Sequence, residues 1–491
     1  MSPDDLRQEA RRRLSLEQGT IRKSGARRVA LVYPSPYRAG MSSLGFQVVY
    51  GALNDLPDVA CERAFLPDDL EAHRQTRAPL FTYETETPVG DFPIVMFSVA
   101  YELELGGVVH CLDLAAIPAR ARDRGEKDPI VVVGGPLTFS NALPLSPFAD
   151  AIVLGEAEDV LGEVVEAISQ ARSRSSAITA LARLPHVLVP GRSLAGATIA
   201  QANEVHVPAR ARITTPEAEL SDMFLVEAER GCSRACTYCV MRRSTNGGMR
   251  LASAQSVISS VPGHARRVGL VGAAVSDHPE IVPIVSALAD SGREVSLSSL
   301  RPDRLDDDFV SALRRGGART LTTAADGASE RLRVALKRGG KNRHLVRAAQ
   351  LVRKHGLQRL KLYLMVGVPG ETDEDIDEMA VFARELSRIC SVALGVAPFV
   401  SKRNTPLDGL PFAGIDVVDA RLARLRASLQ GRVVVKATSA RWAWVEWALA
   451  QGGPEEGLAV LAAVRAGGSF ADYRRALQEV PRAAADPPGA G

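Results

Sequence analysis

Glu229-Arg-Gly-Cys232-Ser-Arg-Ala-Cys236-Thr-Tyr-Cys239 carries three of the six cysteines of this 491-residue chain. The cysteines follow a Cys-x3-Cys-x2-Cys spacing directly after an apolar segment. Three thiolates on one loop can hold three irons of a [4Fe–4S] cube and leave the fourth iron open to a small molecule. Structural zinc prefers four closed ligands, and no other Cys or His lies within a loop's length. The spacing therefore favours an iron–sulfur cluster over zinc.

Six apolar segments alternate with helical segments from this loop onward. The predicted strands are Met223–Ala228, Val268–Val271, Glu294–Ser298, Thr320–Thr323, Leu360–Val366 and Val392–Phe399. Such an alternation predicts a (βα)6 partial TIM barrel over residues 220–410. Barrels of this kind place their sites at the carboxyl ends of the strands.

An earlier α/β pattern covers residues 26–173. The predicted strands there are Arg28–Tyr33, Pro93–Ser98, Pro129–Val133 and Ala151–Leu154. Continuous apolar runs separated by helical stretches predict a doubly wound, Rossmann-like parallel sheet covered on both faces. Gly134 and Gly135 end one strand, and Gly155 and Glu156 end another. Glycines at such strand ends let a ligand approach the backbone closely.

The remaining segments are predicted from their composition. Residues 1–25 form a helical lead-in, residues 174–219 a Pro- and Ala-rich linker, and residues 411–491 a C-terminal helical extension with a disordered tail. The extension contains Trp442, Trp444 and Trp447, for which core packing of a helical lid is favoured over a hydrophobic substrate wall.

Composition limits the class of protein. A net charge of +3 with 46% hydrophobic residues is typical of ordinary globular protein and does not call for nucleic acid or an anionic membrane as a partner. The basic stretch from Arg331 to Arg359 lacks interleaved aromatic residues, so nucleic acid is disfavoured. The N-terminus has no apolar signal region, and no apolar run is long enough to cross a bilayer. We expect a cytoplasmic protein without a membrane partner.

The cysteine spacing and the barrel pattern together resemble the radical S-adenosylmethionine (SAM) superfamily, over about Met223–Asn404. The resemblance implies that Cys232, Cys236 and Cys239 ligate a [4Fe–4S] cluster and that SAM binds at the open iron. It also implies an electron donor such as flavodoxin or ferredoxin. The substrate is left open.

The same resemblance assigns SAM contacts at the strand ends. An aromatic residue near the adenine corresponds to Tyr238, and a backbone turn that meets the methionine amino group corresponds to Gly272, Ala273 and Ala274. The other implied contacts are Ser298, Asp326, Arg331 for the SAM carboxylate, and Gly367 beside the adenine. At the turn of residues 272–274 this chain lacks the acidic side chain that many members carry. For Asp277, just before Pro279, a helix cap is the favoured interpretation.

The N-terminal pattern resembles the cobalamin-binding domain that precedes many radical SAM domains. This resemblance implies corrinoid contacts at Gly134, Gly135, Gly155 and Glu156. The chain departs from the family after its first strand, where many members have Asp-x-His-x-x-Gly and this sequence has neither Asp nor His. The alternative is a relic domain that only shapes the substrate cavity.

These features predict a radical SAM enzyme that cleaves SAM reductively and acts on an unknown substrate. With cobalamin, methylation follows; without it, oxidation or rearrangement remains open. Methylthiolation is disfavoured, because the N-terminal region offers only Cys61 and Cys111 for a second cluster. An iron–sulfur electron-transfer protein is the alternative from another class, and it would not need the SAM features at the strand ends.

Overall fold

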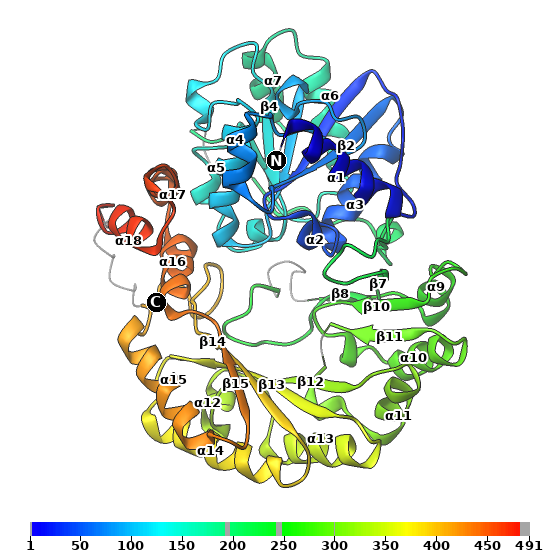
Figure 1. Ribbon diagram of the computed structural model, residues 1–491, viewed down its shortest axis with the longest axis vertical. Coiled ribbons are helices and arrows are strands. Elements are labelled where there is room, and N and C mark those ends of the chain that lie inside the picture. Colours follow the sequence, from blue (N-terminus) through cyan, green and yellow to red (C-terminus); the bar gives the residue numbers. More distant parts are fainter. Residues whose placement is uncertain (1, 192–196, 242–247, 299, 482–491) are drawn as a thin grey trace.

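The structure is a computed structural model that describes residues 2–191, 197–241, 248–298 and 300–481 (Figure 1). Two α/β halves lie next to each other, and the last helices return from the second half to the first. This arrangement confirms the predicted α/β class with parallel sheets. The predicted disordered tail lies outside the described residues.

The N-terminal half is built on a six-stranded sheet in the order β2-β1-β3-β4-β5-β6. Its strands are β1 (Arg27–Tyr33), β2 (Val59–Phe65), β3 (Ile94–Ser98), β4 (Ile130–Gly134), β5 (Ala151–Val153) and β6 (Val187–Leu188). The first five are parallel, and β6 runs antiparallel to β5. The strand order reverses between β1 and β3, as in doubly wound sheets.

Strand β2 is missing from the sequence prediction, because Glu62 and Arg63 interrupt its apolar run. Arg63 is nevertheless only 1% exposed. Its guanidinium lies 2.8 Å from the carboxylate of Glu17 and 2.6 Å from that of Glu84. A buried charge is tolerated when it is paired and hydrogen-bonded, so this strand joins the sheet despite its composition.

Helices cover both faces of this sheet. Helices α3 (Leu44–Asp55), α6 (Leu161–Ser169) and α7 (Arg174–Leu181) pack on one face, and α5 (Leu105–Leu114) packs on the other. The smaller helices are α1 (Pro3–Leu16), α2 (Tyr37–Gly40) and α4 (Leu70–Thr76). Helix α1 agrees with the predicted lead-in. Helix α7 and strand β6 correct the predicted linker, because the start of that region completes the N-terminal core.

The C-terminal half contains all six predicted strands, arranged in two parallel sheets. The first has the order β11-β10-β7 and the second the order β12-β13-β14-β15. The strands are β7 (Met223–Glu227), β10 (Arg267–Val271), β11 (Glu294–Leu297), β12 (Thr320–Asp326), β13 (Arg359–Val366), β14 (Val392–Pro398) and β15 (Val434–Ala437). Strand β15 corrects the prediction of a purely helical C-terminal extension. It is short, and Lys436 ends its apolar run after three valines, so the pattern did not indicate a strand.

Helices line the outside of these sheets in Figure 1. They are α9 (Ala254–Ser259), α10 (Ile281–Asp290), α11 (Asp307–Arg315), α12 (Glu330–Ala335), α13 (Asn342–Lys354), α14 (Asp373–Ser387) and α15 (Ile415–Leu429). A small antiparallel hairpin of β8 (Glu229–Gly231) and β9 (Met249–Leu251) flanks the cysteine loop.

The C-terminal helices α16 (Ala440–Gln451), α17 (Pro454–Ala466) and α18 (Phe470–Gln478) belong to the N-terminal core. Val445, Leu449 and Val460 pack in one apolar cluster with residues of α5 and of the N-terminal sheet. The side-chain nitrogen of the buried Asn141 donates to the carbonyls of Leu449, Ala450 and Gly452, which end helix α16. The chain therefore closes on itself across the two halves.

Candidate cofactor and substrate site

The cysteine loop begins where strand β8 ends. Cys232, Cys236 and Cys239 are partly exposed free thiols. The amide of Cys239 donates to the carbonyl of Cys236 at 3.4 Å, and the Cys232 sulfur accepts from the amide of Arg234 at 3.4 Å. Within the described part of the chain, no three His, Cys, Asp or Glu side chains converge on one metal ion. A [4Fe–4S] cube takes its thiolates on different irons, so three thiols on one loop fit such a cluster without that convergence.

Asp277 anchors this loop. Its carboxylate accepts two hydrogen bonds from Arg234, both at 2.8 Å, and a third from Arg304 at 2.8 Å. The expectation of a helix cap at Asp277 is wrong, because the residue before helix α10 is Glu280. Asp277 instead ties the segment between Cys232 and Cys236 to the end of strand β10.

Tyr238 and Asp326, both predicted to contact SAM, are neighbours in the structure. The Tyr238 hydroxyl donates to an Asp326 carboxylate oxygen at 2.9 Å, and Arg338 pairs with the same carboxylate. Asp326 has a φ of 64°, and the register of β12 on β13 shifts beside it. Left-handed backbone in a non-glycine residue and bulges at strand ends occur preferentially at functional sites.

The turn after β10 brings together Gly272, Ala273 and Ala274, and a buried acid from another strand supports it. The Ala274 amide donates to the Glu229 Oε1 atom at 2.6 Å. A Cβ atom at Gly272 would lie 2.2 Å from the same oxygen, so only glycine fits there. The Ser298 hydroxyl, from the end of β11, donates to the Gly272 carbonyl at 3.0 Å.

Glu229 is fully buried, and its Oε2 atom has no hydrogen-bond partner within the described residues. Burial raises the pKa of this carboxyl to about 7. The turn thus has an acidic side chain after all, supplied from strand β8. Sequence reasoning missed Glu229, although an acid three residues before the first cysteine of the loop is a detectable signal.

Arg331 and Gly367 lie at the next strand ends, and each has a partner within the chain. The Arg331 guanidinium pairs with Asp375 at 2.5 Å and donates to the Gly370 carbonyl. Its predicted contact with the SAM carboxylate stays a prediction. The Gly367 amide donates at 2.6 Å to the buried carboxylate of Glu371, whose pKa burial raises to about 7.

The predicted N-terminal site residues also contact the chain itself. Gly135 and Gly155 have positive φ angles, and a Cβ atom at either would lie within 2.6 Å of the backbone of Val99 or Ala200. Gly134 precedes this turn at the end of β4. At Gly135 and Gly155, the protein's own backbone therefore occupies the space that a side chain would need. The predicted corrinoid contact of these glycines stays a prediction.

Glu156 joins the two halves. Its carboxylate lies 2.5 Å from Arg250 and 3.2 Å from Arg230, the two arginines of the β8–β9 hairpin. Glu158 adds a contact of 2.8 Å to Arg230. The end of strand β5 thus clamps the hairpin from which the cysteine loop emerges.

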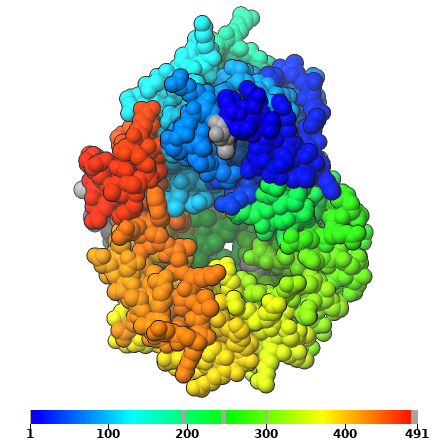
Figure 2. All heavy atoms as spheres, viewed as in Figure 1, coloured from blue at the N-terminus to red at the C-terminus, as the bar shows by residue number. Residues whose placement is uncertain are grey.

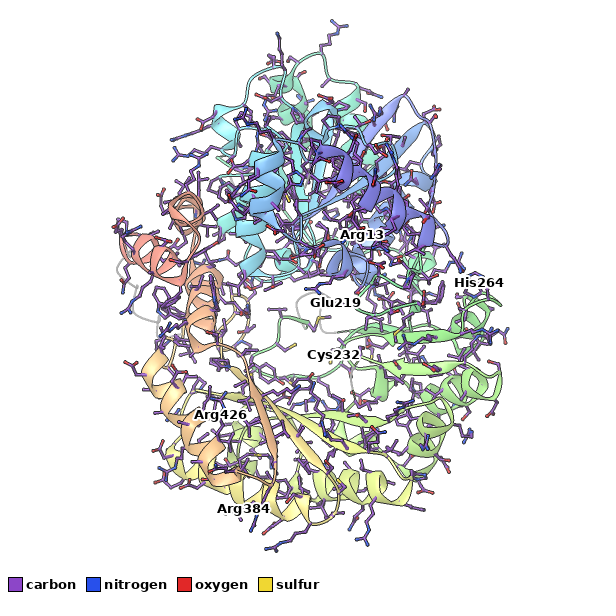
Figure 3. All side chains as sticks on the ribbon, viewed as in Figure 1. Arg13, Glu219, Cys232, His264, Arg384 and Arg426 are labelled. Atoms are coloured by element: carbon purple, nitrogen blue, oxygen red, sulfur yellow. The ribbon has the colours of Figure 1, made fainter. Side chains whose placement is uncertain are left out.

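A hollow lies in the middle of the molecule, between the N-terminal and C-terminal halves (Figure 2). Figure 3 shows Cys232 beside this opening. A cavity of about 450 Å³ borders it, within the range of small-molecule sites. Its lining includes Tyr101, Tyr238, Met365, Lys402, Trp442 and Glu446. Of the three tryptophans, Trp444 packs against the N-terminal core, while the partly exposed Trp442 faces this cavity.

Comparison with known proteins defines the class. A model described as the radical SAM superfamily matches residues 226–383, and one described as radical SAM proteins, N-terminal, matches residues 45–190. The chain belongs to the radical SAM superfamily and is a radical SAM enzyme. The family implies a [4Fe–4S] cluster and SAM as cofactors. No described helix combines the length and the apolar character needed to span a membrane.

Individual relatives are about a quarter identical to this chain over the residues that align. An uncharacterized protein of Methanocaldococcus jannaschii is 27% identical over 393 residues, covering 77% of this chain and 79% of that protein. An uncharacterized methyltransferase of Pyrococcus horikoshii is 25% identical over 52% of this chain and 58% of its own length. A tRNA-2-methylthio-N(6)-dimethylallyladenosine synthase of Bacillus thuringiensis is 24% identical over 42% of this chain and 43% of its own.

Among solved structures, the apo form of the cobalamin-dependent S-adenosylmethionine radical enzyme OxsB matches 84% of this chain with a TM-score of 0.51 and 12% identity. This likeness concerns the fold. The chain spans 58% of the OxsB chain, and it spans the same share of the Pyrococcus horikoshii relative.

Proposed function

We propose that this protein binds a [4Fe–4S] cluster through Cys232, Cys236 and Cys239, cleaves SAM reductively, and directs the resulting radical chemistry at a substrate held in the central hollow. The observation that carries the proposal is a juxtaposition. The cysteine loop, the acid-supported turn of residues 272–274 and the Tyr238–Asp326 pair all lie at neighbouring strand ends.

A cluster with one open iron supplies the electron that such cleavage requires. The protein itself would position SAM and shield the reaction from water. The turn of residues 272–274 would lie against the amino-acid end of SAM, while Glu229 fixes the turn from behind. Tyr238 and Asp326 hold the cysteine loop against strand β12. The N-terminal half and helix α16 contribute Tyr101 and Trp442 to the wall of the same space, where exclusion of water would favour the radical reaction.

Anaerobic reconstitution with iron and sulfide, followed by dithionite and SAM, tests this proposal. We expect 5′-deoxyadenosine from the parent protein and none from Cys236→Ala. The matched control is Cys390→Ala, which changes a half-buried thiol after helix α14 and keeps activity. An intact cluster that yields no 5′-deoxyadenosine would instead support the electron-transfer alternative. The physiological reductant, flavodoxin or ferredoxin, can be compared with dithionite in the same assay.

Cobalamin-dependent methylation is a second candidate for the reaction. The order β2-β1-β3-β4-β5 creates a switch point between β1 and β3, where doubly wound sheets bind ligands. The name of the Pyrococcus horikoshii relative also describes a methyltransferase. We do not assign His73 or His110 as a cobalt ligand, because His73 contacts the Ala78 carbonyl and His110 contacts Arg74.

The visible spectrum of protein purified with hydroxocobalamin tests the second candidate. A corrinoid that stays bound through gel filtration supports methylation. Protein that retains none, yet still forms 5′-deoxyadenosine, would leave oxidation or rearrangement without cobalamin. Methylthiolation remains disfavoured, because Cys61 and Cys111 are buried and burial raises the pKa of both thiols.

A further inference from the structure

The cavity beside the cysteine loop has walls from three parts of the chain. Tyr101 comes from the loop after β3, Met365 from strand β13, and Trp442 from helix α16. Tyr101 is 46% exposed and Trp442 is 36% exposed, unusually open positions for large aromatic rings. Tyr238, next to the ligand Cys239, completes the wall on the cluster side. The cavity thus offers aromatic surface within reach of the cysteine loop.

Among the described residues, Lys402 and Glu446 are the charged side chains in the cavity wall, and the buried Glu102 lies behind them against Lys402. The Lys402 ammonium lies 2.6 Å from the Glu102 carboxylate and 2.7 Å from the Glu446 carboxylate. One cation therefore faces two anions. Glu102 is 2% exposed, and its Oε1 atom has no hydrogen-bond partner within the described residues. Glu446 is part of the cavity wall and partly open to it.

This arrangement of charges favours a cationic ligand group over an anionic one. An anionic group that entered would meet a lysine already paired with two carboxylates, and it would lie close to both. A cationic group would complete the neutralisation and could also rest against the faces of Tyr101 and Trp442, since aromatic faces attract cations. The apolar wall around Met365 would cover an uncharged body.

We propose that the substrate of this enzyme is a molecule with an apolar body and a protonated amine, which binds with the amine at Glu446 between Tyr101 and Trp442. The proposal rests on the proposed radical function of the neighbouring cluster loop, and it adds the chemical class of the substrate. It is independent of which product the radical reaction gives.

Three probes that share a phenyl-substituted four-carbon chain and differ in the charge of the end group test the proposal. They are 4-phenylbutylamine, 4-phenylbutan-1-ol and 4-phenylbutanoate. Isothermal titration calorimetry on the reconstituted full-length protein, without reductant, gives the three dissociation constants. We expect the amine to bind about tenfold more tightly than the alcohol, and the carboxylate to bind most weakly, because a hydrogen bond to a charged group is stronger than a neutral one.

Two variants locate the effect. Glu446→Gln should remove the preference for the amine while leaving binding of the alcohol within about twofold, and Trp442→Ala should weaken all three probes. The matched control is Glu455→Gln, which changes an exposed glutamate on the neighbouring helix α17 and should leave all constants unchanged. Absence of amine binding at millimolar concentration, or an unchanged preference in Glu446→Gln, would overturn the proposal.

SAM cleavage measured in the same preparations separates the two proposals. A retained preference for the amine in a protein that forms no 5′-deoxyadenosine would overturn the radical function alone. Formation of 5′-deoxyadenosine in a protein that binds the carboxylate as tightly as the amine would overturn only the substrate class.

Discussion

The two α/β halves use the carboxyl ends of their strands differently. In the N-terminal half, Gly135 and Gly155 receive the protein's own backbone, and Glu156 grips the cysteine hairpin. In the C-terminal half, the corresponding positions carry free thiols and a glycine turn over a buried acid. Parallel topology only brings strand ends together. The side chains at those ends decide whether they hold the molecule together or bind a ligand.

If the N-terminal strand ends hold the two halves together, Glu156→Ala should have the largest effect on stability. Glu156 is the only carboxylate within ion-pair distance of Arg250 among the described residues. Its removal leaves Arg250 nearly buried without a counter-charge, which costs about 3–5 kcal/mol. Urea unfolding followed by circular dichroism should show a markedly earlier transition, together with loss of bound iron.

Glu158→Ala is the matched control for that variant. Glu158 also contacts Arg230, but Arg230 keeps Glu227 and Glu156 as partners. Its effect should be well under half of that of Glu156→Ala. Equal effects of the two variants would mean that the hairpin is held by general surface charge rather than by one clamp.

Glu371→Gln tests whether the buried Glu371 carboxyl makes the free energy of unfolding depend on pH. Burial raises the pKa of Glu371 from 4.5 to about 7 in the folded protein. As the pH rises from 4.5 to 7, the unfolded chain loses this proton while the folded chain keeps it, so the free energy of unfolding falls. A shift of this size corresponds to at most ~3 kcal/mol.

The measurement is the urea midpoint of the parent protein and of Glu371→Gln at several pH values between 4.5 and 7.5. The parent should lose stability relative to the variant across this range, since glutamine does not titrate. A constant difference between the two proteins would show that Arg421, 2.9 Å away, keeps Glu371 ionised throughout.

Asn141→Ala should destabilise the contact of the C-terminal helices with the N-terminal half by about 1–3 kcal/mol, because it leaves buried carbonyls at the end of α16 without a donor. Limited proteolysis should then cut between α15 and α16 sooner than in the parent. Asn203→Ala, at an exposed asparagine, is the control. Identical cleavage rates in both variants would contradict a structural role for Asn141.

Much of this architecture could be predicted from sequence, because continuous apolar runs identify buried parallel strands. Six strands of the C-terminal half and four strands of the N-terminal half follow from that rule. Strand β2 does not follow from this rule, because its buried Glu62 and Arg63 are stabilised by partners far away in the chain. The return of α16–α18 to the N-terminal core is likewise a long-range contact that no local pattern encodes.

The site divides in the same way. Cysteine spacing on one loop is local and could be predicted, whereas the support of the turn by Glu229 joins residues 45 positions apart. The charged trio of Glu102, Lys402 and Glu446 joins three segments, with 300 positions between the first two. The partner of Arg331 could not be predicted either. The sequence pattern does not single out Asp375 as the acid that pairs with this arginine.

Asp277→Asn should have the smallest effect on stability and a specific effect on the cluster loop. The Asp277 side chain is 4% exposed, but asparagine keeps its size and one side-chain oxygen, and Arg234 and Arg304 are partly open to water. Arg301, 3.8 Å from Asp277, keeps Asp303 as a partner at 3.2 Å, so the change costs about 1 kcal/mol. Arg234 nevertheless lies between Cys232 and Cys236, and without its anchor this segment has more conformational freedom. Iron transfer to a chelator should be several-fold faster than in the parent, with an unfolding midpoint close to that of the parent. Asp290→Asn, at an exposed ion pair on helix α10, should transfer iron at the parent rate, and equal rates for both variants would show that the loop is held by its cluster alone.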